Sequence, residues 1–305
     1  MTTERPQISL GIVGFGEIGH GIGAGLRAEG LRQVSAYDRS AFDGPFSALK
    51  QERAKEAGVT LVESAAALAA ACDYVVVAVP ATGCEAAVEA ILPHLTSRHL
   101  YLDLVSTTPA VKLRQADRLR GSGAMLADGG IMSSPLHDGH RIGIKASGPA
   151  AATFRDRLVP WGMRIEVVSP NFGAATGIKI LRSVAMKGLE ALLHECAVGS
   201  ERYGIRDEVL ETIAEFMDSR PFAETAKFLI RSGVIHAERR SGEAAMAAEA
   251  LIEAGVEPIM TEATVRRLAG VAELGLKERF GGVVPDDWHE AVTAVDRALK
   301  AKDGK

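Results

Sequence analysis

The stretch ISLGIVGFGEIG, residues 8–19, decides the fold of this chain. Its first six residues are almost wholly apolar, as in a central strand that is buried on both faces of a parallel sheet. The strand runs directly into Gly14-Phe15-Gly16-Glu17-Ile18-Gly19 and then into a helix, the context in which such a turn binds a dinucleotide. The first glycine allows the tight turn, the second lets the backbone approach a pyrophosphate, and the third lets the helix pack closely on the strand. We therefore predict that these six residues contact a dinucleotide cofactor.

A pattern of alternating strands and helices extends from this motif to residue 168. Short apolar runs alternate with helical patterns, which is the sequence form of a sheet covered by helices. The expected strands are 8–13, 33–37, 60–62, 74–79, 100–104, 125–128, 141–146 and 164–168, and the expected helices are 18–29, 64–71, 83–92, 109–120 and 149–158. The fold class is therefore predicted to be α/β, with an N-terminal doubly wound, mostly parallel sheet of Rossmann type.

The alternation of strand and helix patterns ends after residue 169. From residue 173 onward only helical patterns occur, interrupted at residues such as Gly204, Pro221 and Gly233. The first of these helices, expected at 174–202, carries apolar residues from Ile178 onward at three-to-four spacing, which predicts a stripe facing a core. We expect a cofactor-binding domain over residues 1–168 and an all-α substrate and dimerisation domain over 169–305, joined by this long interdomain helix.

Composition excludes several classes of function. The 305 residues carry a net charge of −4, and 47% are hydrophobic, so a nucleic-acid or membrane partner is not expected. Cys72, Cys84 and Cys196 are far apart, and the eight histidines show no ligand-like spacing, so neither disulfides nor a metal site are expected. The opening residues lack a basic-then-apolar signal region. These features favour a cytoplasmic enzyme with a small-molecule substrate.

The ends of the later strands suggest how the cofactor is held. Asp38 ends the second strand about twenty residues past the glycines, where an acidic side chain binds the ribose hydroxyls of NAD. Arg39 follows and can pair with the 2′-phosphate of NADP, which Asp38 would repel, so NAD is favoured and NADP is possible. Val79 and Pro80 end the fourth strand, and Ser106 follows the fifth. We expect these three to face the cofactor, and Ser106 to face the substrate as well.

Three stretches resemble the β-hydroxyacid dehydrogenase superfamily, which includes 3-hydroxyisobutyrate, tartronate-semialdehyde and 6-phosphogluconate dehydrogenases. They are the glycine motif at 14–19, DGGIMSS at 128–134 and GAATGIK at 173–179. At Met132 and Ser183 the sequence differs from the usual family pattern. In these differences, and in residues 236–243, the chain resembles the 6-phosphogluconate-dehydrogenase-like branch. That branch carries an uncharacterised C-terminal helical domain of DUF1932 type. The resemblance implies nicotinamide-dependent hydride transfer and reaches over nearly the whole chain.

The resemblance also implies roles for individual residues. The second stretch contacts a substrate carboxylate in the family, which assigns Met132, Ser133 and Ser134 to substrate binding, although the family usually has a serine at the position of Met132. The third stretch supplies the catalytic lysine, here Lys179. An asparagine usually follows four residues later, where this chain has Ser183; we predict that Ser183 contacts the substrate, although a serine also fits a helix interior.

Lys179 suits the chemistry of alcohol oxidation, which needs a group that takes the hydroxyl proton as hydride leaves. Burial, the positive end of the helix dipole and a cationic nicotinamide would all lower the pKa of a lysine at this place. His236, Arg239 and Arg240 form a further candidate cluster at the expected start of a helix reaching residue 254. The arginine fork suits a carboxylate, so His236 and Arg240 are predicted substrate contacts, with a solvated helix face as the alternative.

The leading hypothesis is therefore an NAD(P)-dependent oxidoreductase acting on a small β-hydroxy acid, or a related hydroxy acid or semialdehyde, with Lys179 as general acid/base. One alternative is an imine reductase on the same fold, although such enzymes typically replace the lysine. The other is a non-catalytic NAD(P)-binding sensor. Apolar stretches at 244–252 and 259–271 predict a homodimer or higher oligomer formed through the helical domain.

Overall fold

A computed structural model describes residues 5–133 and 135–303 of the chain. The chain divides into two compact units, Met1–Val184 and Ala185–Lys305, each of which is described by itself. The boundary expected at 168/169 coincides with the end of the last strand, β8 (Arg164–Ser169). The two units divide later, within helix α8 (Ala174–Tyr203).

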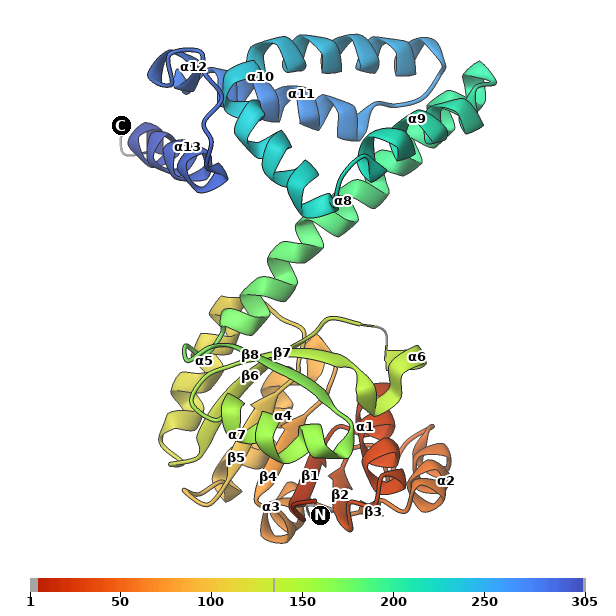
Figure 1. Cartoon of the computed structure of the whole chain (residues 1–305). Helices are drawn as coiled ribbons and strands as arrows, with labels where there is room; N and C mark the ends of the chain where they lie inside the picture. The colour runs from red at the N-terminus through yellow and green to blue at the C-terminus, as the bar shows by residue number, and fades with distance from the viewer. Residues whose placement is uncertain (1–4, 134, 304–305) are drawn as a thin grey trace. The chain divides into compact units, whose positions relative to one another are not determined.

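The first unit is built on one eight-stranded sheet (Figure 1), in the order β3-β2-β1-β4-β5-β6-β7-β8. The strands are β1 (Ser9–Val13), β2 (Gln33–Tyr37), β3 (Thr60–Leu61), β4 (Tyr74–Val77), β5 (Leu100–Asp103), β6 (Met125–Ile131), β7 (Gly143–Ser147) and β8. All neighbours pair in parallel except β6 and β7, which are antiparallel. Every predicted strand is present, with differences only at the ends. Because β1 lies between β2 and β4, the strand order reverses there, which is where open α/β sheets bind their ligands.

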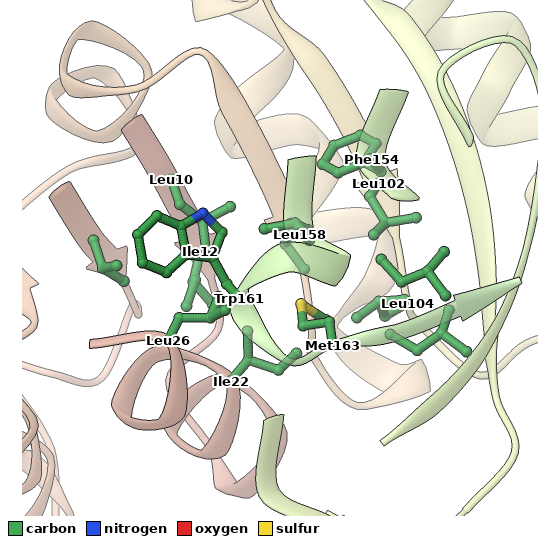
Figure 2. Packing of buried hydrophobic residues seen from close by; sticks show 14 of the residues in the cluster. Leu10, Ile12, Ile22, Leu26, Leu102, Leu104, Phe154, Leu158, Trp161 and Met163 are labelled. Carbon is green, nitrogen blue, oxygen red and sulfur yellow. The ribbon is translucent and has the colours of Figure 1, made fainter. Parts of the chain in front are cut away.

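Helices cover both faces of this sheet. They are α1 (Glu17–Ala28), α2 (Ser47–Ala57), α3 (Ala65–Ala71), α4 (Cys84–Ile91), α5 (Pro109–Arg120), α6 (Pro135–Asp138) and α7 (Ala151–Leu158). One apolar core joins the sheet to α1, α2 and α7, and a second joins it to α3, α4 and α5. Figure 2 shows part of the first core, where Leu10 and Ile12 of β1 lie among side chains of α1 and α7. The doubly wound α/β class is therefore confirmed.

Helix α2 was not predicted from the sequence. Only one of its residues, Ala54, is buried. A helix that buries so little apolar surface carries no three-to-four apolar period, and that period is the main signal by which a helix is predicted. The helix nevertheless matters for the candidate site, because it carries Lys50.

The second unit is helical throughout its described residues. Beyond α8 it contains α9 (Arg206–Asp218), α10 (Phe222–Glu253), α11 (Ile259–Ala272), α12 (Leu276–Arg279) and α13 (Trp288–Asp303). A small core around Val234 and Ile235 of α10 includes Leu276, Ala291 and Ala294. The break expected at Gly233 is wrong, because α10 continues through it. An interior glycine costs a helix about 1 kcal/mol, which the packing of a 32-residue helix offsets.

The apolar stripe of α8 was predicted to face a core, and in the structure it is largely exposed. Ile178 is 42% exposed and Leu181 is 71% exposed, and Leu189 and Leu192 also count among the exposed apolar side chains. The apolar period therefore predicted the helix correctly, but the described residues of the chain do not bury the apolar stripe. Among the described residues, no helix is both long enough and apolar enough to cross a membrane.

Candidate active site

The three glycines of the first turn have the geometry that their expected roles require. Gly14 has φ +95°, and a Cβ there would lie 2.7 Å from the carbonyl oxygen of Ala78. A Cβ on Gly19 would lie 2.0 Å from the carbonyl oxygen of Gly14, so only glycine lets α1 pack this closely. A Cβ on Gly16 would meet nothing within 4 Å. Gly16 is also the N-cap of α1 and has no side-chain cap, which leaves an open helix N-terminus suited to phosphate.

The other three residues of the turn contribute unequally. The Phe15 ring is fully buried in the core and packs edge-on against His20, so the ring cannot reach a cofactor bound at the surface of the turn. The backbone N–H of Phe15 instead donates to Asp38 Oδ2 at 2.8 Å. Glu17 is exposed and Ile18 is partly buried at the start of α1. For Phe15, therefore, only a backbone contribution to the site remains.

Asp38 is engaged by several donors at the end of β2. Its Oδ1 accepts from the backbone N–H and the hydroxyl of Ser40, both at 2.9 Å, and lies 2.6 Å from Lys50 Nζ. Lys50 Nζ also donates to Ser40 Oγ at 2.7 Å. Burial opposes ionisation of Asp38, but the hydrogen bonds from Lys50, Phe15 and Ser40 outweigh it and hold the pKa of the carboxyl below its ordinary value. Asp38 is therefore an ion-paired carboxylate that ties the glycine turn to α2.

A cavity of about 420 Å³ opens beside this carboxylate. It lies at the carboxyl ends of β1, β2 and β4, where the strand order reverses. Its polar lining comes from Asp38, Arg39, Ser40 and Lys50, and its apolar lining includes Val79 and Pro80. The volume is within the ordinary range for small-molecule pockets, and the cavity is lined by four of the predicted cofactor contacts, Asp38, Arg39, Val79 and Pro80.

Lys179 and Ser106 meet at the end of β5, the next strand along the same edge. Lys179 stands near the start of α8, and its Nζ donates a hydrogen bond to Ser106 Oγ. Burial lowers the pKa of Lys179 from its ordinary value, the positive charge of Lys112 lowers it further, and the negative charge of Asp128 opposes both. This lysine therefore gives up its proton more readily than a solvated one.

A buried ionic cluster lies behind this pair and was missed in the sequence. The side chain of Lys112, on α5, is fully buried. Its Nζ lies 2.7 Å from Asp103 Oδ1 and 3.4 Å from Asp128 Oδ1, and donates to the carbonyl oxygen of Asp103 at 3.0 Å. Asp103 is the last residue of β5 and pairs in register with Asp128, which lies within β6. One ammonium thus links two neighbouring strands.

Asp128 also fixes the start of α8. It accepts from the backbone N–H of Thr176 at 2.8 Å and from the Thr176 hydroxyl at 2.6 Å. Ser147 Oγ accepts from the backbone N–H of Ala175 at 3.0 Å. A Cβ on Gly130 would lie 2.9 Å from the carbonyl oxygen of Ala175 and 3.2 Å from Lys179 Cβ. The residues DGG at 128–130 therefore cap α8 and leave room for it against β6, which places Lys179.

The predicted substrate contacts of the first unit cluster near Lys179. The backbone N–H of Met132 donates to the carbonyl oxygen of Gly143, and its carbonyl oxygen accepts from Arg182 Nη1 at 3.3 Å. Ser133 Oγ accepts from the backbone N–H of Gly143 at 3.0 Å. Ser183 Oγ donates to the carbonyl oxygen of Lys179 at 3.0 Å, a bond within its own helix. Ser134 lies outside the described residues.

His236 and Arg240 belong to the second unit, and their substrate role stays a prediction. They lie in the middle of α10 rather than at a helix start, because the helix is not broken at Gly233. Arg240 Nη2 donates to Ser232 Oγ at 2.8 Å, and the neighbouring Arg239 is ion-paired with Glu243 on the same helix. Within 5–133 and 135–303, no three histidine, cysteine, aspartate or glutamate side chains gather as a metal site would require.

Two family profiles match separate parts of the chain. Residues 9–107 match a family described as "NADP oxidoreductase coenzyme F420-dependent", and residues 200–271 match DUF1932, a domain of unknown function. An uncharacterised 28.5 kDa protein of Methanothermus fervidus is 29% identical over 116 residues, a match that spans 38% of this chain and 46% of that relative. The chain thus covers less than half the length of this curated relative.

Solved structures match over most of the chain. One is a conserved protein of unknown function, described as structurally similar to 3-hydroxyacid dehydrogenases, with 29% identity, a TM-score of 0.60 and coverage of 90% of this chain and 100% of the other. Another is a variant of an imine reductase from Myxococcus stipitatus in complex with NAD⁺, with 19% identity, a TM-score of 0.74 and coverage of 96% and 100%. The chain therefore has the fold of NAD(P)-dependent oxidoreductases. It is similar to a protein described as resembling 3-hydroxyacid dehydrogenases, and its residues 200–271 match the DUF1932 model.

Proposed function

We propose that this chain is an NAD(P)-dependent dehydrogenase or reductase that acts on a small β-hydroxy acid, or on a related hydroxy acid or semialdehyde. The observation that carries the proposal is the Lys179–Ser106 hydrogen bond at the end of β5. It lies on the same sheet edge as the cavity beside Asp38. A cofactor that extends from this cavity along the carboxyl ends of the strands would bring its reactive end toward Lys179.

The residues of the first unit suit a dinucleotide. Gly16 leaves open space at the N-terminus of α1, where backbone N–H groups attract phosphate. The cavity lined by Asp38, Arg39 and Lys50 suits the adenosine ribose, with or without a 2′-phosphate. When bound, the nicotinamide ring accepts or donates the hydride.

Lys179 handles the proton in this mechanism. In oxidation its neutral amine takes the proton of the substrate hydroxyl, and in reduction its ammonium returns a proton to the carbonyl oxygen. The hydrogen bond with Ser106 holds Nζ in place, and the Ser106 hydroxyl is proposed to bond the substrate oxygen as well. Ser133 and the backbone of Met132 are proposed to orient the acid group of the substrate.

The test is turnover with a panel of hydroxy acids, keto acids and semialdehydes, measured as absorbance of the reduced nicotinamide with each cofactor. Lys179→Ala should lower turnover by about 10²–10⁴-fold, as expected for loss of a positioned acid/base, and should leave cofactor affinity unchanged. Lys179→Arg should not restore turnover, because a guanidinium keeps its proton at working pH. Lys55→Ala, which removes an exposed lysine from α2, is the control and should leave turnover unchanged.

The pH dependence provides a second readout of the same mechanism. Oxidation needs the neutral amine, so the rate should rise with pH through the pKa of Lys179. That pKa is lowered from 10.5, so the rise should occur below pH 10.5. The rise should be absent in Lys179→Ala. Near-normal turnover in that variant would contradict the mechanism and leave only the fold assignment.

An imine reductase is the second candidate, because the fold is shared with a solved imine reductase. Adding cyclic imines to the panel separates the two activities. Reduction of imines but not of keto acids or semialdehydes, with no loss in Lys179→Ala, would favour this candidate. Tight cofactor binding without turnover of any compound would favour a sensor.

A further inference from the structure

We propose that Lys112 is a positioning residue for Lys179, acting through two buried carboxylates, Asp103 and Asp128. The inference rests on the proposed role of Lys179, although its test does not depend on turnover. Lys112 does not contact the expected substrate position. Its effect passes through the parts of the chain that hold Lys179 and Ser106.

The first part of the argument is geometric. Lys112 Nζ binds both the carboxylate and the backbone carbonyl oxygen of Asp103. Asp103 Oδ1 in turn accepts from the backbone N–H of Val105 at 2.9 Å, which shapes the turn that leads to Ser106. On its other side Lys112 pairs with Asp128, the residue that caps α8 through Thr176. Both partners of the Lys179–Ser106 hydrogen bond are therefore held by segments that Lys112 ties together.

The second part is charge balance. Asp103, Asp128 and Lys112 are almost completely buried, with exposed side-chain fractions of 1%, 0% and 0%. Buried charges are tolerated only when they are paired. Lys112 is the ion-pair partner of both carboxylates, and Asp128 also acts on the ammonium of Lys179. Without Lys112, the full charge of Asp128 acts on Lys179.

The surroundings of Lys179 agree with this account. The charges that act on its amine from neighbouring elements are Lys112 on α5 and Asp128 on β6. Lys112 favours the neutral amine, and Asp128 favours the charged one. Its own helix adds Arg182, whose guanidinium donates to the carbonyl oxygen of Met132. Lys112 therefore offsets the one neighbour that would keep Lys179 protonated.

The test measures the protonation of Lys179 directly. Trace labelling with acetic anhydride modifies only the neutral amine, and peptide mapping over a pH series gives the midpoint for Lys179 in the full chain. In Lys112→Met the midpoint should rise by at least about one pH unit, the low end for a close charge. Lys145→Met, which removes a surface lysine from the neighbouring strand β7, should leave the midpoint unchanged.

A double variant covers the case in which Lys112→Met does not fold. Combining Lys112→Met with Asp103→Asn removes the unpaired carboxylate together with the ammonium, so no excess charge is left at that pair. Asp128 still lacks its cation in this variant, so the Lys179 midpoint should again rise. Circular dichroism checks that the variant is folded.

The outcomes separate the possibilities. A raised midpoint in the folded double variant, with Lys145→Met unchanged, supports the proposal. An unchanged midpoint in the folded double variant overturns it, because Lys112 would then be only a structural cation. If Lys179→Ala were to retain turnover while the midpoint shifts as expected, the proposed function would fail and the coupling of Lys112 to Lys179 would stand.

Discussion

Replacing Lys50 by methionine is expected to weaken the binding of NADP and to leave the binding of NAD nearly unchanged. From the sequence, NAD is favoured because the carboxylate of Asp38 would repel a 2′-phosphate. In the structure, Lys50 Nζ lies 2.6 Å from Asp38 Oδ1, so this repulsion is offset. The pocket lining carries Arg39 and Lys50 against Asp38 alone. We therefore expect cofactor choice to depend on Lys50, because in Lys50→Met the negative charge of Asp38 loses this ion pair.

The size of the effect follows from the local geometry. Lys50 Nζ lies 2.7 Å from Ser40 Oγ, whose hydroxyl donates to Asp38 Oδ1. A phosphate oxygen that accepts this proton in place of Asp38 would lie roughly 5 Å from Nζ, taking about 2.8 Å per hydrogen bond. At that separation, unit charges interact by about 3 kcal/mol at an effective dielectric constant of 20 and by about 0.8 kcal/mol in water. The pocket is open, so about 1.4 kcal/mol is a fair middle value, which corresponds to ~10-fold in affinity.

Isothermal titration calorimetry of both cofactors with the wild-type chain and with Lys50→Met measures this directly. The dissociation constant for NADP should rise by about ten-fold or more, and that for NAD should change little. Raising the ionic strength should shrink the difference, because salt screens exposed charges. Lys55→Met is the matched control, since Lys55 is exposed on the same helix. Equal weakening of both cofactors would refute the reasoning and show that Lys50 acts by shaping the loop.

Three further predictions concern the glycine turn and assembly. Gly19→Ala should lower the free energy of unfolding by at least about 1–3 kcal/mol, as overpacking does, because its Cβ would lie 2.0 Å from the carbonyl oxygen of Gly14. Gly16→Ala, whose Cβ meets nothing within 4 Å, should keep the thermal midpoint and weaken cofactor binding, as calorimetry would measure. The exposed apolar side chains of the helical unit, such as Phe222 and Ile252, predict a homodimer or larger oligomer. Light scattering that gives a monomer at micromolar concentration would contradict this.

The sheet was predictable because its strands carry the strongest kind of sequence signal. Runs such as YVVV at 74–77 are apolar on both faces and lie between turn signals, so they predict buried parallel strands. Helix α2 lacks any comparable signal, since only Ala54 is buried. The apolar period of α8 predicted its helical state but not what covers its stripe, because a period states which residues share a face and not which surface meets them.

Some residues of the candidate site were predictable from the sequence, and others were not. The glycine turn, Asp38 and Lys179 are predicted from the sequence because each follows a recognisable pattern along the chain. Lys50 was missed because its contact with Asp38 depends on how the loop between β2 and α2 folds back. No spacing rule encodes such a loop. A lysine on a surface helix is usually solvated, so its ion pair gives no signal in the sequence.

Lys112 differs from Lys50, because physical reasoning about the predicted sheet points to it. Asp103 ends β5, Asp128 ends the run predicted as the next strand, and the two pair in register in the sheet. Both follow apolar runs, so the fold buries two carboxylates side by side. Leaving such a pair without a cation costs several kcal/mol, so a buried cation is required nearby. On α5 the buried positions are 112, 115, 116 and 119, and the first is Lys112. A lysine on the buried stripe of this helix is therefore the expected counter-ion of the two carboxylates. Asp128, which pairs with Lys112, also binds the first turn of α8, the helix that carries Lys179.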